Sequence, residues 1–259
     1  MCDALRFFFE FTGRWDEWLS LEQQAETKAV AAGDHAKAGS RAYWTGWVSY
    51  LRGQADAVLN CADRAQAHWQ TAQSGARERG HAIRLRGLGH RLKADYPAAI
   101  ATFGESLGLW RSSSAESADV AKALNDLAEV EKDSGDFAAA ERDYRESLRI
   151  ARAVGYAEGV AYITGNLAEL ALDREDWPGA GTLAREALPL SENLGRQVID
   201  RARLPPPRQG SGAAGEGHRR GSILRPARGG DLHPAWLAQS RNRPRGAAGV
   251  RASLASMKR

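Results

Sequence analysis

Cysteine is nearly absent from this sequence of 259 residues. Cys2 and Cys61 are the two cysteines, and neither belongs to a Cys-x-x-Cys or Cys/His spacing. The sequence therefore excludes a disulfide framework and a zinc ribbon, and it favours a reducing compartment. Long apolar runs are also missing, because the apolar stretch at residues 5–11 is too short for a membrane span or a signal peptide. We therefore expect a soluble, cytoplasmic protein.

Motifs of catalysis are missing as well. No GxxxxGK[ST] phosphate-binding loop occurs, and the GxGxxG match at residues 210–215 follows three prolines instead of a buried strand. His35, His68, His81 and His90 have no i,i+4 partner or carboxylate spacing that suits a metal, and we interpret them as surface or groove residues. The prediction is that the protein is not an enzyme, has no catalytic residue and needs neither a cofactor nor a metal.

Proline is scarce and net positive charge is missing until the last quarter of the chain. Six of the nine prolines follow residue 196. Residues 197–259 carry thirteen Lys and Arg against three acidic residues, for a net charge of +10, whereas residues 1–196 have a net charge of −6. The overall +4 therefore belongs to the tail, and the body of the chain does not read as a nucleic-acid binder.

What the sequence does contain is an internal repeat. Segments that begin at Ala94, Gly135 and Glu175 match without gaps, and each continues with Asp, an aromatic residue and, three positions later, a small residue. Two weaker copies begin at Gly13 and Gly53. The equivalent positions, 40 or 41 residues apart, are Trp18, Val58, Ala99, Ala140 and Ala180. A spacing kept over five copies is not an accident of composition.

Each repeat reads as two helices. The first helix carries a small residue twelve positions before the repeat position on the second helix: Gly46, Gly87, Ala128 or Ala168. The second begins at the Asp, a residue type that caps the free N–H groups of a helix start. We therefore predict an all-α protein: a right-handed α-solenoid of about five antiparallel helix pairs over residues 1–196, followed by a disordered tail over residues 197–259.

This pattern resembles the tetratricopeptide repeat (TPR) in a long-period subtype. The family's Leu-Gly pair falls on Leu127-Ala128 and Leu167-Ala168, its turn on Gly135-Asp136-Phe137, and its Ala-Leu on Ser147-Leu148. Glu131 and Ala171 stand where the family has an aromatic residue. HEAT and armadillo repeats share the length but lack the paired small positions, so they rank second. The 40-residue period further resembles the C-terminal repeat arrays of bacterial STAND (NB-ARC-type) signalling ATPases, which implies a sensor arm without its ATPase module.

The tail has two competing interpretations. Arg, Pro and Gly are what GC-rich DNA encodes out of frame, and a permitted one-base-shifted translation of residues 202–251 reads as a further helix pair in register with the repeat. We hypothesise a frame slip near residues 196–199, which would make the chain a truncated, frame-shifted product with no independent function. The alternative is an authentic basic tail that is disordered or binds nucleic acid.

The resemblance also implies which residues contact a partner, because in this family the first helix of each pair faces the concave groove. The predicted partner-binding residues on that face are Tyr43, Trp47, Tyr50, Arg84, Arg91, Asn125, Glu129, Lys132, Asn166 and Glu169. For the aromatic residues, packing between helices is the alternative. The expected function is a non-catalytic scaffold that binds a protein or peptide as the sensor or interaction arm of a signalling protein. Self-association is expected through the uncapped last repeat, where Leu183, Leu188 and Leu190 would be exposed.

Overall fold

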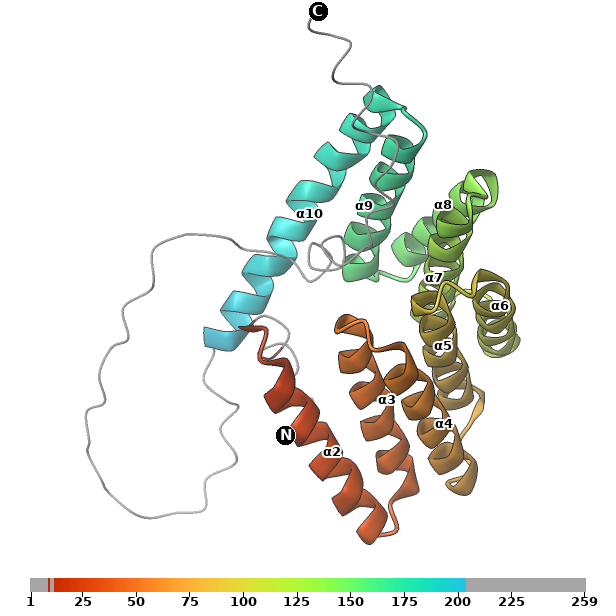
Figure 1. Cartoon of the computed structure of the whole chain (residues 1–259). Helices are drawn as coiled ribbons and strands as arrows, with labels where there is room; N and C mark the ends of the chain where they lie inside the picture. Colours follow the sequence, from red (N-terminus) through yellow and green to blue (C-terminus); the bar gives the residue numbers. More distant parts are fainter. Residues whose placement is uncertain (1–8, 10–11, 204–259) are drawn as a thin grey trace, which may run out of the picture. The chain divides into compact units, whose positions relative to one another are not determined.

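The computed structural model describes residues 9, 12–194 and the backbone of 195–203; the predictions for residues 204–259 lie outside this part of the chain. Every element in the described residues is a helix, and no strand occurs among them (Figure 1). The helices are α2 (Trp15–Ala31), α3 (His35–Leu51), α4 (Ala55–Thr71), α5 (Ala76–Leu92), α6 (Tyr96–Ser113), α7 (Ala118–Ser134), α8 (Phe137–Ala153), α9 (Ala157–Asp173) and α10 (Trp177–Arg203). Among these residues, no helix combines the length and apolarity needed to cross a bilayer.

The described helices fall into two compact units, and the boundary between them lies inside α6. The first, called here the N-terminal unit, comprises residues 15–106 and contains α2 to α5 with the first part of α6. The second, the C-terminal unit, has residues 107–203 as its helical part and contains the end of α6 with α7 to α10.

The five predicted repeat positions lie on the second helices of the pairs and are all buried. Trp18 on α2, Val58 on α4, Ala99 on α6 and Ala140 on α8 have no exposed surface, and Ala180 on α10 has 4%. The five positions thus lie at equivalent, buried places on alternate helices, and the register of the repeats stays a prediction. Antiparallel pairs joined by short turns give the TPR-like solenoid architecture that the repeat predicted (Figure 1).

Small residues on the first helices permit a close approach between helices. A Cβ atom built on Gly46 of α3 would lie 2.6 Å from Leu85 Cδ2 and 2.9 Å from Cys61 Cβ. A Cβ on Gly87 of α5 would lie 2.7 Å from the ring of Phe103. No side chain fits at these distances, so the small residues are a packing requirement of the N-terminal unit.

The turn between α7 and α8 shows why the chain reverses where the sequence predicted. Gly135 has φ +92°, a left-handed conformation that favours glycine at the end of a helix. Asp136 then caps α8, since its Oδ1 accepts a hydrogen bond from Ala139 N at 3.0 Å. Ser147 Oγ on α8 donates to Ala121 O on α7 at 2.6 Å and ties the pair together.

The last described helix differs from the prediction in two respects. α10 continues to Arg203, so residues 197–203, assigned to the tail from composition, are helical. Leu183 was expected to be exposed, but it packs against the core of the C-terminal unit, because it shares a helix face with Ala180 and Ala187. Leu190 is half-buried, and Leu188 is 61% exposed as expected.

Candidate functional site

The ten predicted partner-binding residues lie on first helices of the pairs, five in each unit. Three are on α3 and two on α5 in the N-terminal unit; three are on α7 and two on α9 in the C-terminal unit. Within each unit they contact one another, and we treat them as two clusters. One continuous groove along all ten residues stays a prediction.

The tyrosine–arginine cluster of the N-terminal unit joins α3 to α5. Arg84 Nη1 donates to Tyr43 OH at 3.1 Å, and Arg91 Nη1 donates to Tyr50 OH at 3.2 Å. In both pairs the partners are 41 residues apart. The second contact lies seven residues, about two helical turns, further along the same two helices. The Arg84 guanidinium lies 5.6 Å from the centre of the Trp47 ring, a cation–π contact.

The accessibility of this cluster is uneven. Arg84 is buried, whereas the aromatic residues and Arg91 are half-buried. The aromatic side chains therefore both pack between helices and keep part of their surface exposed. Packing and partner contact, the two alternatives from the sequence, are both compatible with these positions.

The asparagine–glutamate cluster of the C-terminal unit joins α7 to α9 around one carboxylate oxygen. Glu129 Oε1 accepts hydrogen bonds from Asn125 Nδ2 at 3.0 Å, Asn166 Nδ2 at 3.1 Å and Tyr162 OH at 2.7 Å. Asn166 Nδ2 also donates to Asn125 Oδ1 at 2.9 Å. Tyr162 was not among the predicted residues; it lies four residues before Asn166, one turn away on the same helix face.

The carboxylate fixes the orientation of both amides. An ionised carboxylate only accepts hydrogen bonds, so both asparagines must turn their NH₂ groups towards Glu129. The Oδ1 atom of Asn166 then faces away from the carboxylate and accepts no hydrogen bond from a described residue. The arrangement thus provides one oriented acceptor at a site where little solvent competes, because Asn166 is 8% exposed.

Lys132 and Glu169 form an ion pair beside this cluster. Lys132 Nζ lies 3.0 Å from Glu169 Oε2 and 4.0 Å from Asp173 Oδ2, and the lysine side chain is almost completely buried. The pair fastens the end of α7 to α9. The ion pair and the two asparagine amides together give α7 and α9 both charged and neutral polar groups side by side.

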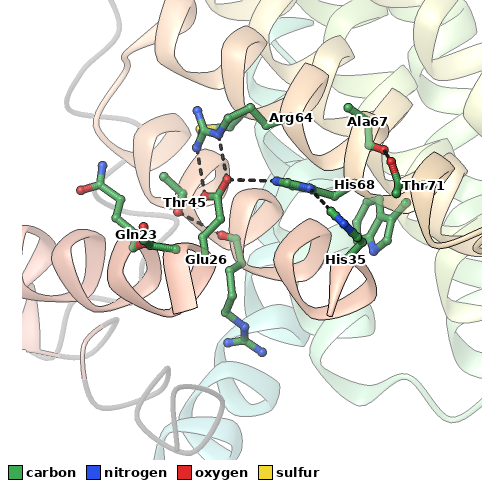
Figure 2. A network of polar contacts seen from close by, with 12 residues as sticks. Gln23, Glu26, His35, Thr45, Arg64, Ala67, His68 and Thr71 are labelled. Carbon is green, nitrogen blue, oxygen red and sulfur yellow. Dashed lines mark hydrogen bonds and ion pairs between the residues drawn. The ribbon is translucent and has the colours of Figure 1, made fainter. Parts of the chain in front are cut away.

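A second polar network, which sequence reasoning missed, lies in the N-terminal unit (Figure 2). Arg64 and His68 of α4 contact Glu26 of α2, and His68 also contacts His35 at the start of α3. The histidines are 33 residues apart, so no spacing along one helix could show their contact. No group of three or more metal-ligating side chains is present in the described residues.

Two kinds of comparison place this fold among known proteins. Residues 81–153 and 119–193 match a family model described as Tetratricopeptide repeat. A search of curated proteins found no match. Among solved structures, the chain is similar to a Rap protein complexed with Competence and Sporulation Factor, with a TM-score of 0.66 and 15% identity over 77% of this chain and 55% of that one.

Two further structures show the same likeness. The apo form of RapI has a TM-score of 0.57 with 15% identity over 74% of this chain and 73% of that one. BtubC from P. vanneervenii has a TM-score of 0.54 with 16% identity over 79% and 99%. These likenesses show a fold of stacked helix pairs. With the family match, they support a tetratricopeptide repeat protein.

Proposed function

We propose that the protein is a non-catalytic scaffold that binds a protein or an extended peptide on the face made by the first helices of its repeats. The observation that carries the proposal is the asparagine–glutamate cluster, in which two asparagines 41 residues apart are oriented by one carboxylate. A peptide backbone presents donors and acceptors at every residue whatever its sequence. Oriented amides suit such a backbone, because the bonds within the cluster leave Asn166 Oδ1 as an acceptor and the second N–H of the Asn125 amide as a donor.

The tyrosine–arginine cluster supports a complementary contribution to binding. Tyrosine, tryptophan and arginine are frequent at the energetically dominant positions of interfaces. The aromatic side chains are rigid and lose little entropy on binding, and the guanidinium group offers a planar set of hydrogen-bond donors. Half-buried Tyr43, Trp47 and Tyr50 offer flat apolar surface beside two guanidinium groups. We propose that this cluster contacts side chains of the partner, while the asparagines contact its backbone.

The likeness to a Rap protein complexed with Competence and Sporulation Factor supports ligand binding by this fold. The chain spans 55% of that Rap protein, so the type of partner and the role of the whole protein are part of the proposal. The resemblance to STAND repeat arrays supports a role as the sensor or interaction arm of a signalling protein. Sequencing the gene with its flanks tests this role: a phosphate-binding loop encoded in frame upstream would support it, and its absence would contradict it.

Peptide selection tests the binding proposal without a known partner. Peptides selected from a random phage library on the wild-type protein are titrated calorimetrically against the double variant Asn125→Ala/Asn166→Ala. Loss of two hydrogen bonds, each contributing about 1 kcal/mol, should weaken binding about tenfold or more. The control is Asn193→Ala on α10, an exposed asparagine of the same unit, which should bind as the wild type does.

The double variant also removes hydrogen bonds within the protein, so folding needs its own measurement. Circular dichroism and a urea unfolding curve show whether the variant is folded under the titration conditions. A second variant, Asn166→Asp, keeps the size of the side chain but places a carboxylate beside Glu129. Equal affinities for wild type and folded variants would place the binding site elsewhere.

A further inference from the structure

The start of α3 is held against α4 by a contact between two imidazole rings. His35, the first residue of α3, and His68 on α4 approach with their Nδ1 atoms 3.3 Å apart. One residue further along α3, Ala36 O accepts a hydrogen bond from Trp69 Nε1 at 3.2 Å. Two neighbouring residues of α4 thus contact the first turn of α3. The titratable one, His68, is drawn beside His35 in Figure 2.

The geometry of the two rings distinguishes a shared proton from a metal site. The ring centres lie 5.6 Å apart, which is the Nδ1–Nδ1 distance plus about one ring radius on each side. Both nitrogens therefore lie near the line that joins the ring centres, and their lone-pair directions point at each other. Two ligands of one tetrahedral metal ion would converge on it at an angle instead. A hydrogen bond from one ring to the other fits this geometry.

Glu26 sets the direction of that hydrogen bond. Glu26 Oε1 lies 3.6 Å from His68 Nε2, and the carboxylate accepts but does not donate, so the Nε2 position of His68 is favoured for a proton. In the neutral ring, Nδ1 of His68 is then an acceptor, and His35 Nδ1–H is the donor. A first added proton goes to Nε2 of His35 and preserves the contact. A second must go to Nδ1 of His68, where it meets the N–H of His35.

The surrounding charges do not relieve this conflict. From α2, Glu26 is bound at 2.9 and 3.2 Å by Arg64 of α4, whose charge offsets that of the carboxylate. Asp34, next to His35, is 2.6 Å from Lys37 Nζ on α3. Cys61 of α4 lies 3.5 Å from Arg64 Nη2. From α5, the His81 ring centre lies 5.4 Å from that of Tyr43. One imidazolium in the pair is tolerated, but two facing N–H groups are not.

We propose that the His35–His68 contact is a pH-sensitive latch between α3 and α4, which opens when both imidazoles are protonated. Histidine is the side chain whose charge ordinarily changes between about pH 5 and 8. Opening frees the first turn of α3, the helix that carries Tyr43, Trp47 and Tyr50. Acidification therefore loosens one end of the helix that presents the aromatic face of the N-terminal unit. This regulation is independent of whether a peptide binds there.

Hydrogen exchange of the full chain, followed by mass spectrometry at pH 7.5 and pH 5.0, tests the latch. After correction for the pH dependence of the chemical exchange rate, amides in the first turns of α3 should exchange about tenfold faster at pH 5.0 in the wild type. In His35→Asn and in His68→Asn, where the uncharged amide can turn its oxygen towards the remaining imidazolium, that acceleration should be lost. His90→Asn on α5, a histidine beside Asp95, should keep it.

Three outcomes would overturn the latch. The first is equal exchange of the wild type at both pH values, and the second is an unchanged acceleration in the two latch variants. The third is a zinc-dependent rise in the thermal midpoint of the wild type that both variants lose, because it would mean that the lone pairs converge on a metal ion. The wild-type measurement alone can contradict the proposal, so it does not depend on the stability of the variants.

Discussion

At the scale of single residues, Glu131 shows how one substitution within a repeat creates a titratable group in a packed position. Its side chain lies near the end of α7, where the repeat family has an aromatic residue, and it is 8% exposed. Oε2 has no hydrogen-bond partner among the described residues, and Arg142 Nη2 lies 3.9 Å from Oε1. Burial, reinforced by the neighbouring carboxylate of Asp143, raises the pKa of Glu131 to about 7.

This raised pKa predicts a pH-dependent stability of a definite sign. In the unfolded chain the Glu131 carboxyl has its ordinary pKa of 4.5, so the folded state binds a proton at Glu131 more tightly than the unfolded state does. The stabilisation is complete below about pH 4.5 and is lost as the pH rises through 7. Glu131→Gln keeps the shape without the charge, so at pH 8 it should raise the free energy of unfolding by an amount on the order of 1–3 kcal/mol.

Urea unfolding at pH 5 and pH 8 measures the effect. The difference between Glu131→Gln and the wild type should be larger at pH 8 than at pH 5. The exposed Glu105 provides the control, because Glu105→Gln should change stability little at either pH. If the two differences for Glu131→Gln are equal, the carboxyl does not titrate in this range.

Sequence reasoning recovered some of these residues and not others, for a physical reason. Asn125 and Asn166 occupy the same position of successive repeats, so the repeat spacing alone predicts that they are neighbours. Tyr162, His35 and His68 do not repeat, and their contacts depend on the rotation of each helix about its axis. The protonation behaviour of Glu131 depends on burial and on Asp143, neither of which a spacing shows.

At the scale of helices, the repeat predicted the architecture because the same few contacts recur in each pair. A buried small or apolar residue lies in the first turns of the second helix of each pair. The Asp residues that cap α6, α8 and α10 each accept a hydrogen bond from a backbone N–H three residues later. The end of α10 could not be placed by this logic. Composition changes after residue 196, but residues 196–203 contain no proline or glycine that would end a helix.

Packing within a pair predicts a large difference between two alanines of α8. Ala140 is completely buried against α7, whereas Ala138 on the same helix is exposed. Ala140→Arg should therefore lower the free energy of unfolding by several kcal/mol, because it overpacks the contact and buries a charge. Ala138→Arg, the same chemical change in solvent, should stay within about 0.5 kcal/mol of the wild type. Equal urea midpoints for the two variants would refute the register of the repeat.

At the scale of the whole molecule, the two units divide the predicted binding face. The aromatic and arginine side chains belong to residues 15–106, and the asparagines belong to residues 107–203. A partner that needs both clusters must span both units, whereas a short peptide needs one. The repeat period predicted which residues lie on the first helices. The boundary between the two units could not be predicted, because it falls inside α6, whose sequence shows no break.

An apolar stripe on α10 leads to the last prediction, which concerns association between molecules. Trp177 is 67% exposed and Leu188 is 61% exposed. They are eleven residues apart, about three turns, so they lie on one face of the helix, with exposed Ala184 between them. In stacked-helix proteins such a face is ordinarily covered by the next repeat or by a polar cap. We expect the same stripe of a second copy to cover it, giving a dimer whose population rises with concentration.

Sedimentation velocity over a hundredfold concentration range measures this association. Leu188→Glu places a charge in the stripe, so the variant should need at least about tenfold more protein to reach the same weight-average mass, because burying an unpaired charge costs well over 1.4 kcal/mol. Val30→Glu on α2 is the matched control: Val30 is also exposed, at 43%, but lies in the other unit. If Leu188→Glu associates like the wild type, or if Val30→Glu abolishes association equally, the stripe on α10 is not the contact.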